Sequence, residues 1–236
     1  MAKKLTKIKA ILFDIDDTLF DRNIAQSQML ELFKREYVDI FSDIDEHMIN
    51  TAFLEADRYS TEAFFATGLV DSVRIKRFEI FLAMLGIEQE HARSMLNLYL
   101  DNYAKVDAEM EGAKAVLKKL AEKYQLGVIS NGLAKAQYQK LDSIGIKNIF
   151  ESITISEEVG LQKPDPRIFW KAGSGLDRKP EECLYVGNSY NIDILGAIAA
   201  GMASCWFNPG GNRPVEQERK PDYEISSLRD ILKTIK

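Results

Sequence analysis

The chain has 236 residues, of which 46% are hydrophobic and 28% are charged, as in ordinary globular proteins. Its formal net charge of −5 argues against a nucleic-acid polymer or a membrane surface as the partner. Two cysteines and two histidines exclude a disulfide framework and leave almost no basis for a histidine-rich zinc site or a histidine-based triad. Because no segment resembles a signal peptide or a membrane span, a cytoplasmic protein is expected.

Short apolar runs of strand length alternate with helical patterns along the chain. The runs are Ile8–Phe13, Leu126–Ser130, Ser152–Ile155, Cys183–Gly187 and Ala203–Phe207. The helical patterns between them are Ala113–Tyr124, Ala134–Gly145, Pro166–Gly175 and Ile192–Gly201. The runs are apolar nearly throughout, as expected for strands that are covered on both faces. This alternation predicts an α/β fold with a Rossmann-like parallel sheet core and helices on both faces.

One interval is too long for a single β–α–β step, which needs roughly 30 residues. Between the first two runs, Met29, Phe33, Tyr37 and Phe41 recur every four residues, which is typical of a helix with one apolar face. The interval is therefore predicted to be an inserted, all-helical cap domain over residues 20–107. Residues 1–19 and 108–236 would form the α/β core.

Acidic residues follow the first apolar run. Asp14 and Asp16 are two residues apart, so their side chains face the same place on an extended segment. Two carboxylates this close repel each other unless a proton or a cation lies between them. Such a pair suits a nucleophilic carboxylate beside a general acid/base. An ordinary acidic turn matches the pair equally well, so the later strand ends decide the interpretation.

Polar residues also follow the other predicted strands. Ser130 ends the second run, and the backbone N–H groups of Asn131 and Gly132 open toward a helix N-terminus, which suits an anion. Lys163 follows the third run and Asp193 the fourth, at steps of about 30 residues, one β–α unit each. Because open α/β sheets bind ligands at the carboxyl ends of their strands, these residues are expected at one site.

The combined residues predict chemistry on phosphate with a hard cation that prefers oxygen ligands. Asp14 would attack phosphorus and form an aspartyl-phosphate, and Asp16 would protonate the leaving oxygen and then deprotonate the attacking water. Mg²⁺ would bridge Asp14, the phosphate and Asp193. Lys163 and Ser130 would offset the charge on the transferring oxygens.

Four motifs together resemble the haloacid dehalogenase superfamily: Asp14-x-Asp16-x-Thr18-Leu19, the strand-terminal Ser130, Lys163 before Pro-Asp-Pro, and Gly187-x(5)-Asp193. The resemblance implies a magnesium-dependent phosphatase with a C1-type helical cap. It also implies that Asp14 is the nucleophile and that Asp16 is the acid/base, with its backbone carbonyl on the metal. Members that cleave carbon–halogen bonds lack an acid at the Asp16 position, so the resemblance argues against dehalogenase activity.

Segments beginning at Ile129, Ile155 and Cys205 are more narrowly similar to YjjG-type pyrimidine 5′-nucleotidases. This similarity implies a small phosphorylated substrate, most plausibly a nucleoside monophosphate. Asn188 stands where the fourth motif usually has its first aspartate. Its side-chain oxygen is an uncharged ligand, so Mg²⁺ is expected to bind more weakly than in relatives with the acid.

Other interpretations stay open. The same site would serve a sugar-phosphate or phosphoglycolate phosphatase, or a phosphotransferase. A receiver-like phospho-aspartate switch also uses a strand-end aspartate, Mg²⁺, a hydroxyl and a lysine, but such a module has the length of one ordinary domain and needs neither a cap nor Asp16. A monomer or a small homo-oligomer is expected.

Overall fold

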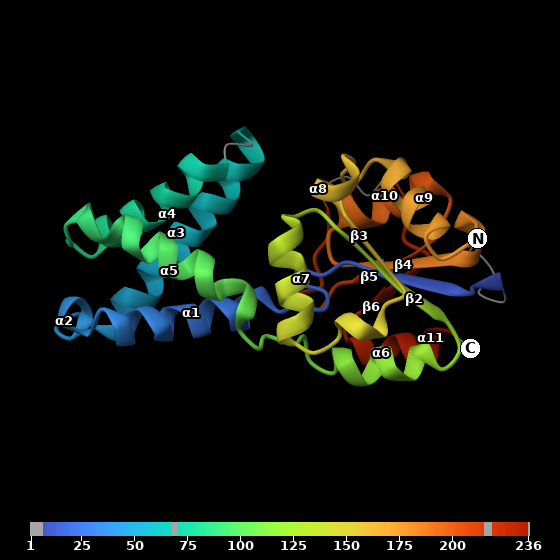
Figure 1. Cartoon of the computed structure of the whole chain (residues 1–236), viewed down its shortest axis with the longest axis horizontal. Helices are drawn as coiled ribbons and strands as arrows, with labels where there is room; N and C mark the ends of the chain where they lie inside the picture. Colours follow the sequence, from blue (N-terminus) through green and yellow to red (C-terminus); the bar gives the residue numbers. More distant parts are fainter. Residues whose placement is uncertain (1–6, 68–69, 215–218, 236) are drawn as a thin grey trace. The chain divides into compact units, whose positions relative to one another are not determined.

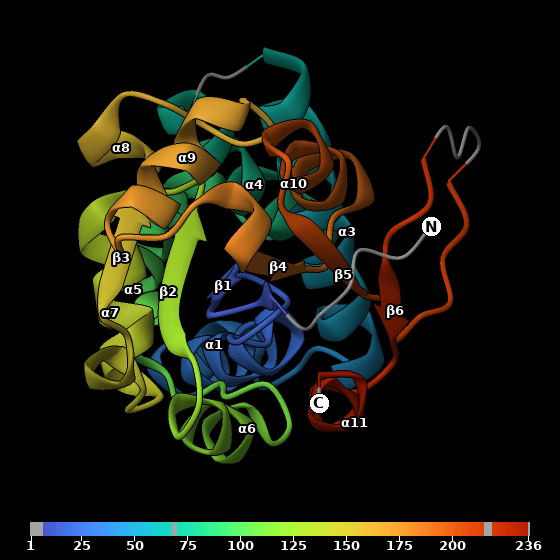
Figure 2. The ribbon, with the colours of Figure 1, turned by 90° about the vertical axis from the view of Figure 1, so that its right-hand side faces the viewer.

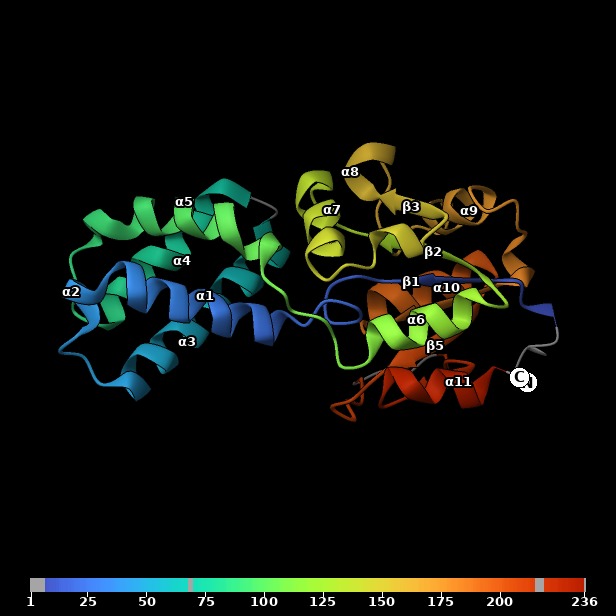
Figure 3. The same ribbon diagram turned by 60° about the horizontal axis from the view of Figure 1, so that its bottom comes forward.

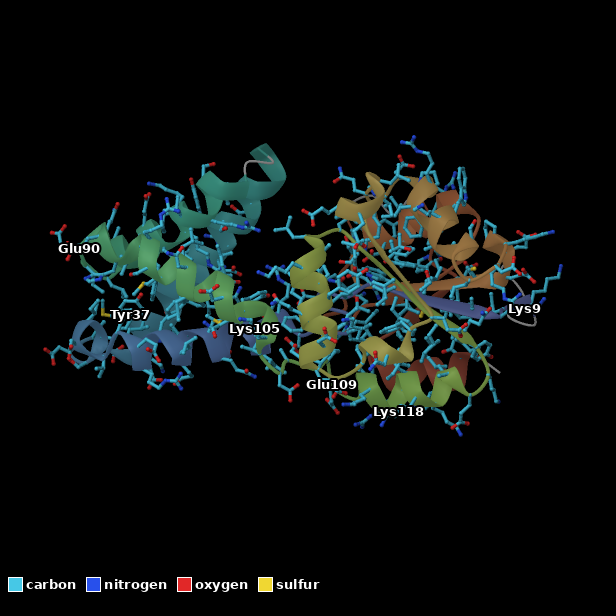
Figure 4. The ribbon with its side chains drawn as sticks, in the orientation of Figure 1. Lys9, Tyr37, Glu90, Lys105, Glu109 and Lys118 are labelled. Carbon is cyan, nitrogen blue, oxygen red and sulfur yellow. The ribbon has the colours of Figure 1, made fainter. Side chains whose placement is uncertain are left out.

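The computed structural model describes residues 7–67, 70–214 and 219–235. The chain divides into two compact units, one made of Met1–Arg22 with Asp107–Lys236 and the other of Asn23–Val106. The first unit contains the sheet and the second is helical (Figure 1). Charged side chains such as Lys9, Glu90 and Lys118 extend from the surfaces of the units (Figure 4). The domain boundaries expected from the sequence, at residues 20 and 107, stay a prediction.

A parallel sheet forms the centre of the first unit (Figure 2). Over the described residues it has six strands in the order β3-β2-β1-β4-β5-β6. The strands are β1 (Ala10–Phe13), β2 (Gln125–Ser130), β3 (Ser152–Ile155), β4 (Cys183–Gly187), β5 (Ala203–Phe207) and β6 (Tyr223–Ile225). All neighbouring strands pair in parallel, so the predicted parallel α/β core is confirmed. The edge strand β6 was not predicted.

Helices cover both faces of this sheet. On one face, Phe169 of α9 (Pro166–Ser174) and Ala197 of α10 (Leu195–Ala200) share a buried cluster with Leu12 and Tyr185. On the other face, α6 (Ala113–Ala121) and α11 (Ile231–Thr234) lie side by side (Figures 1 and 3). The two remaining helices, α7 (Ala134–Ser143) and α8 (Ser156–Val159), follow β2 and β3.

The second unit has a hydrophobic core of its own. Its helices are α1 (Arg22–Glu36), α2 (Val38–Phe41), α3 (Glu46–Thr67), α4 (Val70–Met84) and α5 (Ala92–Asn102). Phe33 lies at the centre, with its ring centroid 5.9 Å from that of Phe53 and 5.5 Å from that of Phe78, in edge-to-face contacts. Met29 and Phe41 of the predicted apolar face are also buried. In the described parts of the chain, no helix is long and apolar enough to cross a membrane.

Candidate active site

Asp14 and Asp16 lie in a tight turn at the carboxyl end of β1. The backbone N–H of Asp14 donates to the carbonyl of Val186 in β4 at 2.9 Å, which extends the sheet by one residue. Three of the following N–H groups donate to the carbonyl of Ile15. Asp17 takes a φ of +56° in this turn, a conformation that aspartate adopts more readily than most other residues. The turn thus keeps both predicted catalytic aspartates at one edge of the sheet.

Lys163 lies at the centre of a buried cluster of polar groups. Its Nζ atom donates to Oδ1 of Asp14 at 2.6 Å, to Oδ1 of Asp193 at 2.7 Å and to the hydroxyl of Tyr185 at 2.9 Å. The three charged side chains are each 9% exposed or less. Each ammonium hydrogen therefore has a partner, and one cation faces two carboxylates. The structure brings together three residues from three separate segments of the chain.

Asp193 has both carboxylate oxygens engaged. Oδ1 accepts from Lys163 and also from the Tyr185 hydroxyl at 3.2 Å, and Oδ2 accepts from the backbone N–H of Ser189 at 2.9 Å. Gly187 permits this close approach, because a Cβ atom at that position would lie 2.5 Å from Cγ of Asp193. The carboxylate is therefore oriented toward Lys163.

Ser130 and Asn131 lie at the carboxyl end of β2, beside β1. Ser130 is buried and pairs with Ile155 of β3. The Asn131 side chain holds the backbone of Lys163: its Oδ1 accepts the Lys163 N–H and its Nδ2 donates to the Lys163 carbonyl, both at 2.8 Å. Asn131 therefore fixes the loop that carries the lysine. The phosphate-binding roles of Ser130 and Asn131 stay predictions.

Asp16 is paired with a second lysine, which the sequence analysis missed. Lys140 Nζ lies 2.5 Å from Oδ1 of Asp16, and Nε2 of Gln137 donates to Oδ2 at 3.0 Å. The two residues are three positions apart in α7 and so lie on one face of the helix. Both are buried, at 6% and 4% exposure. Asp14 and Asp16, expected to face the same place, are therefore neutralised by different cations.

Asn188 lies in the loop after β4, near the turn that carries Asp16. Its Oδ1 accepts from the hydroxyl of Thr18 at 3.4 Å, and its backbone carbonyl accepts from the indole N–H of Trp206 at 2.8 Å. The Trp206 contact fixes the backbone of the loop. An uncharged oxygen thus lies beside the aspartate turn, at the position where the motif usually supplies a carboxylate.

The surroundings of the two aspartates shift their pKa values in opposite directions. Burial raises the pKa of Asp14 to about 7; the charges of Asp193 and Asp16 add to the rise and Lys163 opposes it. Burial also disfavours the ionised form of Asp16, but the charge and hydrogen bond of Lys140 and the hydrogen bond of Gln137 hold its pKa below the usual range. Burial alone would lower the pKa of Lys163, whereas the two adjacent carboxylates raise it. A cation bound beside Asp14 would favour its ionised form.

The oxygen-rich donor set fits Mg²⁺, which is usually bound by one or two carboxylates and keeps several waters. In residues 7–67, 70–214 and 219–235, no three side chains of His, Cys, Asp or Glu form a metal-binding group. A magnesium ion would therefore need Asp14 together with the Asp16 carbonyl and the Asn188 amide oxygen. Asp193 as a ligand stays a prediction, since hydrogen bonds engage both of its oxygens. When both are ionised, Asp14 and Asp193 exceed the single positive charge of Lys163, so the cluster keeps a net negative charge for a divalent cation.

Tyr185 also belongs to the site, although its place in an apolar run predicts only a buried strand residue. It is buried in the middle of β4, and its hydroxyl contacts both Lys163 and Asp193. A buried tyrosine hydroxyl needs a hydrogen-bond partner, and this need was the only signal available in the sequence. For Lys140 and Gln137 the sequence shows only two polar residues at helical spacing. It does not indicate which part of the protein their side chains face.

Comparisons with known proteins agree with this geometry. A family model described as haloacid dehalogenase-like hydrolase matches residues 8–201. A glyceraldehyde 3-phosphate phosphatase from Methanopyrus kandleri is 30% identical, and the match covers 97% of each chain. The pyrimidine 5′-nucleotidase YjjG of Escherichia coli is 27% identical over 94% of this chain and 95% of the relative.

Solved structures include a similar chain with bound metal. The HAD-hydrolase YfnB of Bacillus subtilis, crystallised with magnesium, is 26% identical with a TM-score of 0.77. The match covers 98% of this chain and 99% of that structure. The expected superfamily resemblance and fold class are thus confirmed.

Proposed function

The chain belongs to the haloacid dehalogenase-like hydrolase family and is a phosphomonoester hydrolase; from this premise we propose that it works with Mg²⁺ through an aspartyl-phosphate on Asp14. The observation that supports the proposal most directly is the buried contact between Asp14 and Lys163, 2.6 Å long, at the carboxyl end of β1. This contact places a carboxylate beside a fixed cation at the sheet edge where α/β folds bind ligands.

Each residue has a distinct chemical task in this proposal. Asp14 attacks phosphorus in line, and the bond to the leaving oxygen breaks. Lys140 and Gln137 favour ionised Asp16, so this carboxylate must first take up a proton. It then gives that proton to the leaving oxygen and later takes one from the water that cleaves the aspartyl-phosphate. Lys163, with Ser130 and the N–H of Asn131, offsets charge on the transferring oxygens. When bound, Mg²⁺ would supply positive charge beside Asp14 and the phosphate.

The metal would be held by the Asp14 carboxylate, the Asp16 backbone carbonyl and the Asn188 side-chain oxygen. Asp193 positions Lys163 in this scheme, since its oxygens already accept three hydrogen bonds. The magnesium bound to the YfnB structure supports the choice of cation. The uncharged Asn188 supports a weaker site than one with a carboxylate at that position.

Two classes of small phosphorylated substrate are supported by the relatives. The phosphatase of M. kandleri, named for glyceraldehyde 3-phosphate, favours a short sugar phosphate. YjjG, named as a pyrimidine 5′-nucleotidase, favours a nucleoside 5′-monophosphate. Both are phosphate esters of a primary alcohol, so one site and one mechanism would serve either substrate.

Phosphate release from a panel of nucleoside monophosphates and sugar phosphates, with and without Mg²⁺, tests the proposal. We expect turnover that requires the metal and that is abolished by Asp14→Asn. The matched control is Asp142→Asn, which removes an exposed carboxylate from α7 and should leave turnover unchanged. A stable phosphorylated protein that releases no phosphate would instead favour the receiver-like switch.

A further inference from the structure

We propose that Trp206 positions the Asn188 side-chain oxygen for Mg²⁺ and so sets the affinity of the metal site, an inference that rests on the function proposed above. Trp206 lies in the segment that begins at Cys205, to which the four motifs assign no role. An indole N–H is a donor only, so it cannot bind a cation itself. Trp206 therefore acts through Asn188.

The indole of Trp206 reaches from β5 to the loop that follows β4. Trp206 pairs with Gly187, the last residue of β4, so its side chain starts beside the residue that leads into this loop. Its Nε1–H donates to the backbone carbonyl of Asn188 at 2.8 Å, which is a short hydrogen bond. The bond ties the loop after one strand to the neighbouring strand of the sheet.

A second bond holds the other polar group of the same peptide. The N–H of Ser189 donates to Oδ2 of Asp193 at 2.9 Å, while the carbonyl of Asn188 accepts from Trp206. Because a peptide group is planar, fixing both its N–H and its C=O fixes its orientation. The point from which the Asn188 side chain leaves the backbone is thereby fixed as well.

Packing holds the indole in one orientation. Trp206 is 2% exposed and shares a buried cluster with Tyr190 and Ile194 of the helical turn after the loop. The ring centroids of Tyr190 and Trp206 are 5.5 Å apart. Tyr190 is held in turn, because its hydroxyl donates to the carbonyl of Arg219 at 2.6 Å. A donor that is packed in this way is suited to fix its acceptor.

The side chain of Asn188 is directed toward the aspartate turn. Its Oδ1 accepts from the hydroxyl of Thr18 at 3.4 Å, and Thr18 lies two residues after Asp16. An amide oxygen has two lone pairs, so one remains for a cation. The attraction between a cation and a carboxylate falls slowly with distance, whereas that of a neutral dipole falls faster and depends on its direction. The uncharged Asn188 therefore contributes only when its oxygen is well placed.

The second tryptophan shows that such a bond is not specific by itself. Nε1 of Trp170 donates to the backbone carbonyl of Ala200 at 2.9 Å. Tyrosine and tryptophan usually find a partner when they are buried, so an indole–carbonyl bond is an ordinary structural feature. The acceptor distinguishes Trp206, because its carbonyl belongs to a proposed metal ligand. Trp170 is therefore a matched control.

The experiment titrates Mg²⁺ alone into the metal-free protein and measures its dissociation constant by calorimetry. Trp206→Phe keeps an aromatic ring and removes the N–H donor. Since residues that orient metal ligands typically change metal affinity by about 10- to 100-fold, we expect the dissociation constant to rise about 10-fold. Trp170→Phe removes the same kind of bond away from the site and should leave the dissociation constant unchanged.

A double-mutant cycle separates positioning from a general loss of structure. In Asn188→Ala the side-chain oxygen is absent, but the backbone carbonyl that accepts from Trp206 remains. If Trp206 acts through that oxygen, adding Trp206→Phe to Asn188→Ala should cause no further loss of Mg²⁺ affinity. A merely structural role would lower the affinity by the same factor with and without the Asn188 side chain.

An unchanged dissociation constant in Trp206→Phe would overturn the inference, as would an equal loss in the Asn188→Ala background. If Trp206→Phe does not fold, 3-benzothienylalanine takes its place at position 206, since it keeps the shape of the indole and has sulfur instead of the N–H. The same two outcomes then decide. A wild-type protein that binds no Mg²⁺ would overturn the proposed function, whereas the inference fails by itself only when the wild type binds the metal.

Discussion

Replacing Lys163 by methionine tests the buried cluster directly. The ammonium group contacts Asp14 at 2.6 Å and Asp193 at 2.7 Å, and all three side chains are nearly inaccessible to water. Methionine keeps most of the volume but leaves two buried carboxylates facing each other. Breaking a buried ion pair in this way costs about 3–5 kcal/mol of unfolding free energy.

The loss should depend on pH in a defined direction. The pKa of Asp14, about 7 in the folded protein, lies above its ordinary value of 3.8, so the folded state retains a proton that the unfolded chain releases. The contribution of the Asp14 carboxyl group to the free energy of unfolding is therefore highest below pH 4 and is lost as the pH rises toward 7. Lys163 stays charged throughout this range. We therefore expect the full deficit of Lys163→Met at pH 8.5 and about half of it at pH 5.5, where Asp14 is largely neutral.

Urea unfolding without added metal, followed by tryptophan fluorescence, measures this effect. The chain has two tryptophans, Trp170 and Trp206, and both lie in the α/β unit, so the signal reports that unit. Lys171→Met, at an exposed position of α9, should change stability by less than about 0.5 kcal/mol. A further Asp193→Asn change should recover part of the loss. A loss of unfolding free energy below about 1 kcal/mol at both pH values would refute the stabilising role of Lys163 between the two carboxylates.

Three further changes test other parts of the site. Asn188→Asp adds a charged ligand, so Mg²⁺ should bind about 10-fold or more tightly by calorimetry; unchanged affinity would place the residue away from the metal. Gly187→Ala puts a Cβ atom against Asp193, so kcat should fall at least about 10-fold while the helical unit stays folded by circular dichroism. Asn131→Ala removes two hydrogen bonds to the Lys163 backbone and should lower kcat about 10-fold in a steady-state assay. An unchanged kcat would show that the Lys163 loop keeps its position without Asn131.

Much of the core could be predicted because strands covered on both faces are apolar throughout. Strands β1, β4 and β5 are buried throughout, and β2 and β3 are buried toward their carboxyl ends, whereas β6 is mostly exposed. Tyr223 and Glu224 of that edge strand are partly exposed or exposed, and only Ile225 is buried. The helix expected from Ile192 also differs, since α10 begins at Leu195 after a wider helical turn over Tyr190–Ile194. Sequence periodicity does not distinguish these two kinds of helical turn.

The polar residues of the site could be predicted because each lies at the carboxyl end of a strand or in the segment that follows it. The residues that hold them in place could not be predicted. Lys140 and Gln137 lie within a helical pattern, and they turn toward Asp16 only because α7 packs against the turn after β1. Tyr185 is hidden in an apolar run, and its role depends on which strand lies beside it. Such contacts arise from tertiary packing and leave no local sequence pattern.

The central claim is that Asp14 carries the phosphoryl group during turnover. The most direct measurement is to quench the protein during turnover of a substrate, reduce the acyl-phosphate with borohydride, and locate the modified residue by mass spectrometry. The account predicts that Asp14 alone is converted to homoserine, and that the conversion requires both substrate and Mg²⁺. Conversion of another aspartate, or none while phosphate is steadily released, would contradict it.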